Sequence, residues 1–241
     1  MIELFSQPET WISLATLSAL EIVLGIDNIV FITIVAGKLP PDRRPAGRRV
    51  GLALALITRL ALLASLTWVM GLTAPLFSLF DHPFSGRDLI LIGGGLFLIA
   101  KATVEVYDKV EAAHPAAASA AQGAATFGWV IFQIMLLDMV FSLDSVITAI
   151  GMVKEISIMV TAVVLAMIVM IIFANAVGNF VERHPSIKIL ALAFLVMIGA
   201  LLVAEGTGRH LEKGYVYFAM AFSLGIELLN MRYRARQERA A

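Results

Sequence analysis

The hydrophobic residues of this sequence form long continuous runs, and short polar segments separate one run from the next. A helix that crosses a bilayer needs about 20 mostly apolar residues, and seven runs have this character. Their approximate bounds are Trp11–Ala36, Val50–Phe77, Leu89–Thr103, Thr126–Met152, Ile156–Val181, Ile187–Ala204 and Tyr215–Met231. The runs do not alternate apolar and polar residues, which argues against the strands of a membrane β-barrel. The pattern therefore predicts seven membrane-spanning helices.

Composition assigns this pattern to a class of protein. Hydrophobic residues make up 60% of the 241 positions and charged residues 15%, with a mean hydropathy of +0.90. Soluble domains contain about 45–50% apolar and about 25% charged residues, and a soluble chain of this length could not bury the excess. Ordinary soluble enzymes and disordered chains are therefore excluded. We expect an all-α polytopic membrane protein that forms a single membrane domain over residues 1–241.

The charges cancel overall but not by position. The 18 basic residues equal the 18 acidic residues in number, which argues against nucleic-acid binding. Thirteen Lys and Arg residues fall in the first, third and fifth connections and in the C-terminal tail. Four fall on the other side, namely Arg87, Lys154, Arg209 and Lys213. Because cytoplasmic loops are rich in Lys and Arg, the N-terminus is expected outside and the C-terminus in the cytoplasm.

Two of the predicted spans carry the same pattern of polar residues. Residues 21–30 read EIVLGIDNIV and residues 138–147 read DMVFSLDSVI, and they align without a gap at an offset of 117 positions. The aligned pairs are Glu21 with Asp138, Gly25 with Ser142, Asp27 with Asp144, and Asn28 with Ser145. Apolar positions match easily by chance, but two acids in the same register with the same small and polar neighbours do not. The sequence therefore contains an internal repeat.

Each copy of this repeat holds three predicted spans, and the odd number has a topological consequence. The second copy must enter the membrane from the opposite side, which is the inverted repeat found in many alternating-access transporters. We expect an inverted 3+3 repeat plus a seventh helix, with repeat one at about 11–108, a linker at about 109–125 and repeat two at about 126–206. A final helix at about 215–231 precedes a basic cytoplasmic tail at 232–241. A duplication without a transport role is the alternative.

The acids of the repeat are the candidate functional residues. A charged Asp at the bilayer centre costs at least about 2.5–3.5 kcal/mol, so such acids need a proton, a basic partner or a bound cation. Arg59 is the only base in the middle of a predicted span and cannot neutralise four carboxylates. The candidate metal ligands are Glu21, Asp27, Asn28, Asp138, Asp144 and Ser145. This all-oxygen set favours a hard divalent ion such as Mg²⁺, Ca²⁺ or Mn²⁺, and the absence of cysteine excludes thiolate sites.

Several roles stay open at this point. Some acids could be protonated and hold helices together by hydrogen bonds. Arg59 could be a structural counter-ion or a coupling residue that takes over an acid when the metal leaves. Asn175 and Asn179 lie on one face of their helix, either as interhelical hydrogen-bonding groups or, with Ser142, as supporting groups behind the ligands. An undistorted helix directs the two acids of each segment apart, and Gly25 or Ser142 could permit a local unwinding that brings them together.

The same residues resemble a known family. LEIVLGIDNIVF in the first span and QIMLLDMVFSLDSVITAIGM in the fourth are similar to the paired signatures of the TerC family of bacterial membrane proteins. GYVYFAMAFSLGIELLNMR in the seventh span resembles that family's closing segment. The motifs occur in the family's order, and the resemblance covers nearly the whole chain. It looks like the short form, without the cytoplasmic CBS and transporter-associated domains of some relatives.

The resemblance implies a role in metal homeostasis at the bacterial inner membrane. The family is named for tellurite resistance, and its members are associated mainly with manganese homeostasis, as exporters in a superfamily that includes LysE-type transporters. The family fold, an inverted repeat of three helices plus a seventh, agrees with the pattern above. The metal-binding positions that the resemblance implies are Glu21, Asp27 and Asn28 in the first motif and Asp138, Asp144 and Ser145 in the second.

Efflux of a divalent metal, with Mn²⁺ as the first candidate, is the main hypothesis. The ion would bind between the first and fourth spans, and protons could exchange at the same carboxylates. The expected partners are the metal ion and the lipid bilayer, with a homo-oligomer left open and no tightly bound cofactor. The alternative is a non-transporting membrane subunit of a metal-delivery or tellurite-resistance complex. We do not expect an enzyme, because no protease signature accompanies the acids.

Overall fold

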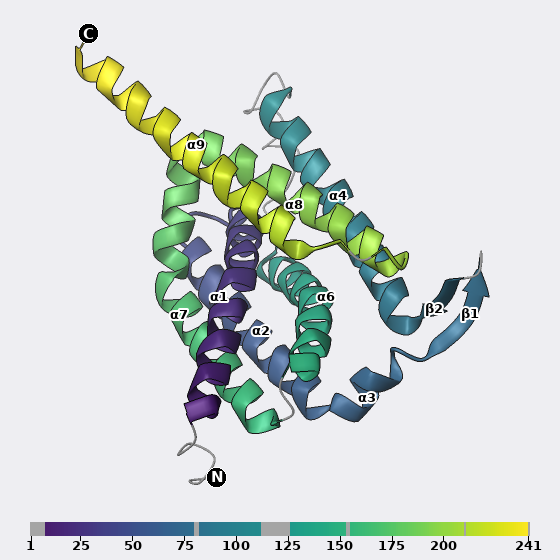
Figure 1. The fold of residues 1–241 in the computed structure, drawn as a ribbon. Helices are drawn as coiled ribbons and strands as arrows, with labels where there is room; N and C mark the ends of the chain where they lie inside the picture. The colour runs from purple at the N-terminus through teal and green to yellow at the C-terminus, as the bar shows by residue number, and fades with distance from the viewer. Residues whose placement is uncertain (1–7, 80–81, 112–125, 153–154, 210, 241) are drawn as a thin grey trace.

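The long apolar runs form the long helices of a nearly all-helical fold (Figure 1). The computed structural model describes residues 8–79, 82–111, 126–152, 155–209 and 211–240, apart from several side chains that include that of Asp27. Its elements are α1 (Pro8–Ala36), α2 (Arg44–Ala64), α3 (Leu66–Gly71), β1 (Pro75–Leu79), β2 (His82–Ser85), α4 (Gly86–Val110), α6 (Phe127–Met152), α7 (Ile156–Arg183), α8 (Pro185–Gly206) and α9 (Lys213–Ala240).

Six helices in the described part of the chain are long and apolar enough to cross a membrane, namely α1, α4, α6, α7, α8 and α9. The remaining long helix, α2, has 21 residues but carries Arg44, Arg48, Arg49 and Arg59. Three of these arginines lie in its first two turns and reduce its hydropathy. Membrane length and hydropathy are therefore confirmed for six of the seven predicted spans. That α2 also crosses the membrane stays a prediction.

The second predicted span, Val50–Phe77, is wrong at its C-terminal end. After α2 and the short α3, residues Pro75–Leu79 form a strand that pairs antiparallel with His82–Ser85. Pro75 and Pro83 account for the difference, because proline has no amide N–H to donate and disfavours a helical conformation in the residue before it. This hairpin also corrects the expectation of a purely α-helical fold.

A capping box sets the start of α4, next to the hairpin. The Ser85 backbone N–H donates to Asp88 Oδ2 at 2.8 Å, and the Asp88 N–H donates to Ser85 Oγ at 3.3 Å. This reciprocal pair satisfies amide groups that the first turn of a helix leaves without a partner. Because Arg87 lies between the two residues, its backbone is held in the first turn of α4.

The helices pack in two main sets of contacts. The most extensive contact lies between α4 and α8, where Gly95 faces Gly199. A Cβ atom on Gly95 would lie 2.5 Å from the Gly199 carbonyl oxygen, and one on Gly199 would lie 2.7 Å from the Gly95 carbonyl oxygen. Only glycine permits backbones to approach this closely. In the other set, α1 packs on α7, and α2 packs on both α6 and α7.

The first predicted cytoplasmic connection, between α1 and α2, lies beside the C-terminal ends of α4 and α7. Lys38, after α1, places its Nζ 2.8 Å from Glu105 Oε2 near the end of α4. Arg44, at the start of α2, places its Nη1 3.7 Å from Glu182 Oε2 near the end of α7. We call this the basic end. The final helix, α9, runs across the outside of the bundle and is mostly exposed (Figure 1).

Candidate functional site

Arg59 of α2 lies at the centre of a buried polar cluster inside the bundle. Its guanidinium pairs with Glu21 of α1 and with Asp138 of α6, where Arg59 Nη2 is 3.2 Å from Asp138 Oδ1. Arg59 Nε donates to Ser142 Oγ at 3.0 Å, and Ser142 Oγ donates to Asp138 Oδ2 at 3.1 Å. All four residues are no more than 4% exposed. We call them the Arg59 cluster.

The Arg59 cluster joins the two copies of the sequence repeat through one cation. Glu21 and Asp138 occupy aligned positions of the repeat, and the guanidinium between them stays protonated at physiological pH. Two ionised carboxylates and one guanidinium leave one negative charge in excess. An uncompensated buried charge costs several kcal/mol, so this cluster favours a retained proton or a second cation nearby.

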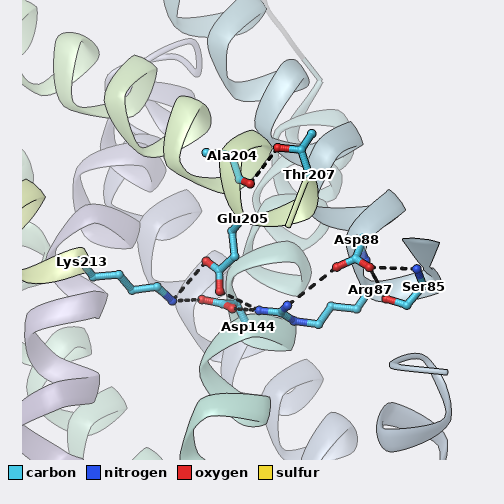
Figure 2. A network of polar contacts seen from close by, with 8 residues as sticks. All are labelled: Ser85, Arg87, Asp88, Asp144, Ala204, Glu205, Thr207 and Lys213. Atoms are coloured by element: carbon cyan, nitrogen blue, oxygen red, sulfur yellow. Dashed lines mark hydrogen bonds and ion pairs between the residues drawn. The ribbon is translucent and has the colours of Figure 1, made fainter. Parts of the chain in front are cut away.

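A second set of ion pairs lies beside the start of α4, at the opposite end of this helix from Glu105 (Figure 2). Asp144 of α6 pairs with Lys213 and with Arg87, where Arg87 Nη2 is 2.6 Å from Asp144 Oδ1. Glu205 of α8 contacts the same two cations, with its carboxylate oxygens 2.8 Å from Arg87 Nη2 and 3.5 Å from Lys213 Nζ. These four residues form the Asp144 network. They connect the start of α4, the interior of α6, the end of α8 and the start of α9.

Three members of the Asp144 network were not among the predicted site residues. The charge pattern places Arg87 and Lys213 in connections between spans, and it does not single out Glu205. Arg87 is 57 positions from Asp144 and Lys213 is 69 positions from it, so no local spacing relates them. One feature could have pointed to these two cations: Arg87 and Lys213 each lie within the first two residues of a long apolar helix.

A small cavity of about 50 Å³ lies beside both sets of ion pairs. Its polar lining includes Arg59 from the first set, Asp144 and Lys213 from the second, and the side chains Asn28 and Ser145. One water needs about 10–15 Å³ on the same measure, so the cavity has room for a partly hydrated ion. Three of the six predicted ligands thus offer oxygen atoms at one place.

The other predicted ligands lie elsewhere. Glu21 and Asp138 belong to the Arg59 cluster and reach the cavity only through Arg59, which lines it. The Asp27 side chain lies outside the described part of the structure, so its predicted role as a ligand stays a prediction. Among the residues that the structure describes, no three acidic or histidine side chains come together as a metal-binding group. Arginine and lysine side chains stand beside these acids instead.

The two asparagines of α7 lie toward the basic end, outside the cavity lining. Arg48 Nη1 donates to Asn179 Oδ1 at 3.1 Å and to the Asn175 backbone carbonyl at 3.4 Å. The Asn179 side chain therefore makes an interhelical hydrogen bond, which was one of its two interpretations, whereas Asn175 offers Arg48 its backbone carbonyl. Their partner is α2, and neither residue is near enough to support the ligands at the cavity.

Helices α1 and α6 run without a break through Gly25 and Ser142. The two acids of α6 accordingly point to different places, Asp138 into the Arg59 cluster and Asp144 into the Asp144 network. Gly25 serves close packing, because a Cβ atom there would lie 2.1 Å from Met170 Sδ of α7. The local unwinding considered from sequence is absent from both of these helices.

Six helices of membrane length, two sets of ion pairs between them and a cavity lined in part by polar residues are the features of an integral membrane protein with charged groups inside its helix bundle. The sequence matches the family described as Integral membrane protein TerC family over residues 6–241. The chain belongs to the TerC family, which confirms the resemblance seen in its motifs.

Three relatives illustrate how far the likeness extends. A UPF0053 protein of Haemophilus influenzae is 52% identical over 234 residues, which are 97% of this chain and 98% of that protein. The UPF0053 inner membrane protein YgdQ of Escherichia coli strain K12 is 51% identical over 226 residues, 94% of each chain. The UPF0053 inner membrane protein YoaE of the same strain is 50% identical over 95% of this chain and 44% of YoaE. No solved structure matches this chain significantly.

Proposed function

We propose that this protein transports a divalent metal ion across the bacterial inner membrane, with Mn²⁺ as substrate and efflux as direction. The observation that carries the proposal is the position of Asp144, an intramembrane carboxylate that lines a cavity together with Asn28 and Ser145. Carboxylate, amide and hydroxyl oxygens suit a hard divalent ion. The metal is cargo in this proposal, and the protein catalyses no reaction on it.

The pattern of helix contacts supports an inverted 3+3 repeat. If α1, α2 and α4 correspond to α6, α7 and α8, the contact of α1 with α7 corresponds to the contact of α6 with α2. Both contacts are extensive, and α4 packs against its own counterpart α8. A two-fold relation between the halves produces this exchange of partners. In the proposal, α2 also crosses the membrane, so that seven helices span it. The two halves then rock against each other around α1 and α6.

The charge distribution supports an orientation. The basic end faces the cytoplasm by the positive-inside rule, which leaves the N-terminus and the Asp144 network on the periplasmic side. In this orientation the ion pairs of the Asp144 network tie α4, α6, α8 and α9 together between the cavity and the periplasm. The network then acts as the outer barrier, and the metal enters from the cytoplasm.

The two networks supply a cation-exchange mechanism. Without metal, Arg87 and Lys213 neutralise Asp144. When Asp144 turns to an arriving metal, both cations keep Glu205 as a partner, since it already contacts each of them. Arg59 lines the same cavity and keeps Glu21 and Asp138 paired throughout this exchange. Opening to the periplasm then restores the original pairs as the metal leaves, and protons can replace it at the same carboxylates.

Metal flux into liposomes tests the proposal. We expect the purified protein to move Mn²⁺ faster than protein-free liposomes do, and to move it in preference to Zn²⁺ because the cavity offers oxygen and no sulfur or imidazole ligands. An opposing proton gradient should accelerate the flux. The measurement compares Mn²⁺, Mg²⁺, Ca²⁺ and Zn²⁺ with and without that gradient. A preference for Zn²⁺ contradicts the ligand argument, and the absence of flux for all four ions favours a non-transporting subunit.

Thiol labelling tests the outer barrier. The chain has no cysteine, so Ser145→Cys introduces a single reporter at the cavity. We expect a membrane-impermeant thiol reagent added from the periplasmic side to label it at least about tenfold faster when Arg87→Gln and Lys213→Gln are added. A loss of about 1.4 kcal/mol from the closed state changes its population by that factor.

The matched control for the labelling experiment is Arg209→Gln. Arg209 is exposed and lies four residues before Lys213, so this change removes a cation from the same side of the bundle outside the Asp144 network. It should leave the labelling rate of Ser145→Cys unchanged. Equal rates in the control and in the double replacement would contradict a barrier made by these ion pairs.

A further inference from the structure

Four lysines gather at the basic end, on α4, α8 and the connection after α1. They are Lys38, Lys101, Lys109 and Lys188, and we call them the lysine cluster. Lys101, Glu105 and Lys109 lie on one face of α4 at four-residue intervals, and Lys38 Nζ is 2.8 Å from Glu105 Oε2. Lys101 and Lys38 repel each other, as do Lys188 and Lys109. Glu105 connects the two pairs, because it interacts with Lys38, Lys101 and Lys188. The ammonium groups therefore share one site and do not occupy separate stretches of surface.

Positive charge exceeds negative charge within this site. Glu105 is 8% exposed and is shared among three lysines, and Asp108 interacts with Lys101. Four ammonium groups against these two carboxylates leave two positive charges in excess. Like charges at close range repel more strongly as they leave bulk water. An anion placed among the lysines would remove that repulsion.

The neighbouring arginines increase the excess. Glu182 of α7 is 3.3 Å from Arg48 Nη2 and 3.7 Å from Arg44 Nη1, and it also interacts with Lys188. These neighbours add two cations and one carboxylate, so the excess rises from two positive charges to three. Glu105, Asp108 and Glu182 are three carboxylates against these six cations and do not complete the neutralisation.

The surroundings of the cluster favour a lipid as the source of the anion. Val104 and Tyr107 of α4 and Ile189 of α8 lie close in sequence to the lysines and are 58%, 59% and 39% exposed. Exposed apolar side chains on membrane helices contact acyl chains, and tyrosine is enriched at the headgroup level. A lipid gains both contacts at once, whereas free phosphate gains nothing from the apolar residues.

We propose that the lysine cluster binds the phosphate group of an anionic glycerophospholipid in the cytoplasmic leaflet. Basic pockets between membrane helices on the cytoplasmic side are suited to such headgroups. The bound lipid lies across α4 and α8, which form the largest contact between the two halves of the chain. Occupancy therefore strengthens the interface between the halves.

Lipid titration of the full-length protein in a neutral detergent tests this site. Native mass spectrometry would follow the binding of phosphatidylglycerol to the wild type and to Lys101→Gln/Lys188→Gln. We expect about 30-fold weaker binding in the double variant, since each lysine near an anionic lipid contributes about 1 kcal/mol. The competing ligands are phosphatidylethanolamine of the same chain length and inorganic phosphate. Phosphatidylglycerol should raise the melting temperature of the wild type, and neither competing ligand should do so.

Two matched variants separate charge from folding. Arg43→Gln/Arg236→Gln removes two exposed cations that do not belong to the lysine cluster and should bind phosphatidylglycerol nearly as the wild type does. Lys101→Arg/Lys188→Arg keeps the charge and should also bind normally. Without lipid, Lys101→Gln/Lys188→Gln should melt no lower than the wild type, because it relieves repulsion. The proposal is overturned if the two glutamine variants bind phosphatidylglycerol with equal affinity. It is also overturned if phosphatidylethanolamine or inorganic phosphate raises the melting temperature as much as phosphatidylglycerol does.

Discussion

Asp144→Asn is expected to lower Mn²⁺ flux at least about tenfold, because it removes an ionised ligand at the cavity. Asparagine has nearly the same size, so helix packing changes little. The fold should survive, since Arg87 and Lys213 both keep Glu205 as a partner. Flux would be measured in liposomes that contain equal amounts of folded protein. Asp27→Asn, at the aligned position of the first repeat, is expected to act in the same way.

The control for this experiment comes from the same network. Glu205→Gln removes a carboxylate from the same two cations, Arg87 and Lys213, but Glu205 does not line the cavity. It should lower the Mn²⁺ flux less than Asp144→Asn does, because it removes the partner that holds the two cations during exchange but no proposed metal ligand. An equal loss of flux in Asp144→Asn and Glu205→Gln would mean that Asp144 acts only as an ion-pair partner, and the ligand role would be wrong.

Arg59→Gln is expected to lower the free energy of unfolding by about 3–5 kcal/mol, because it leaves Glu21 and Asp138 buried without a cation. Glutamine preserves some hydrogen bonding to Ser142 but none of the charge. Unfolding by denaturant in a neutral detergent, followed through the fluorescence of the three tryptophans, measures the loss. Arg43→Gln is the control, because the Arg43 side chain is 65% exposed and its loss should change stability by less than about 0.5 kcal/mol.

A neutral version of the Arg59 cluster tests the physical reason. Adding Glu21→Gln and Asp138→Asn to Arg59→Gln removes the uncompensated carboxylates and should recover most of the lost stability. Recovery shows that charge compensation, and not the shape of Arg59, is what the cluster requires. If Arg59→Gln alone is as stable as Arg43→Gln, the acids of the cluster are already neutral, and the ion-pair interpretation fails.

Both networks hold membrane acids with cations from the chain itself. Arg59 serves an aligned pair of acids, Glu21 and Asp138, whereas Asp144 has two cations that it shares with Glu205. This difference separates the expected roles. The Arg59 cluster is buried, borders the cavity through Arg59 alone, and stabilises the contact of α1, α2 and α6. The Asp144 network borders the cavity and can exchange partners, which is the property that transport requires.

The apolar runs alone determined most of the helices. In a membrane, a long apolar segment satisfies its own backbone hydrogen bonds as a helix, so hydropathy is a sufficient guide. The run Ile156–Val181, for example, predicted α7 to within two residues. The same guide failed after α3, where Pro75 begins a strand despite its apolar neighbours. The repeat of residues 21–30 at 138–147 also identified acids that the structure places in buried networks.

Only the tertiary structure decided which cation meets which acid. Arg59 is 38 positions from Glu21 and 79 from Asp138, and no spacing in the sequence relates them. The sequence pattern suggested that the acids outnumber the available bases, because it counted Arg87 and Lys213 as loop residues. Helix packing brings both to Asp144. The physical reason is that helix formation depends on neighbouring residues, whereas an ion pair depends on distance through space, which the packing of every helix sets together.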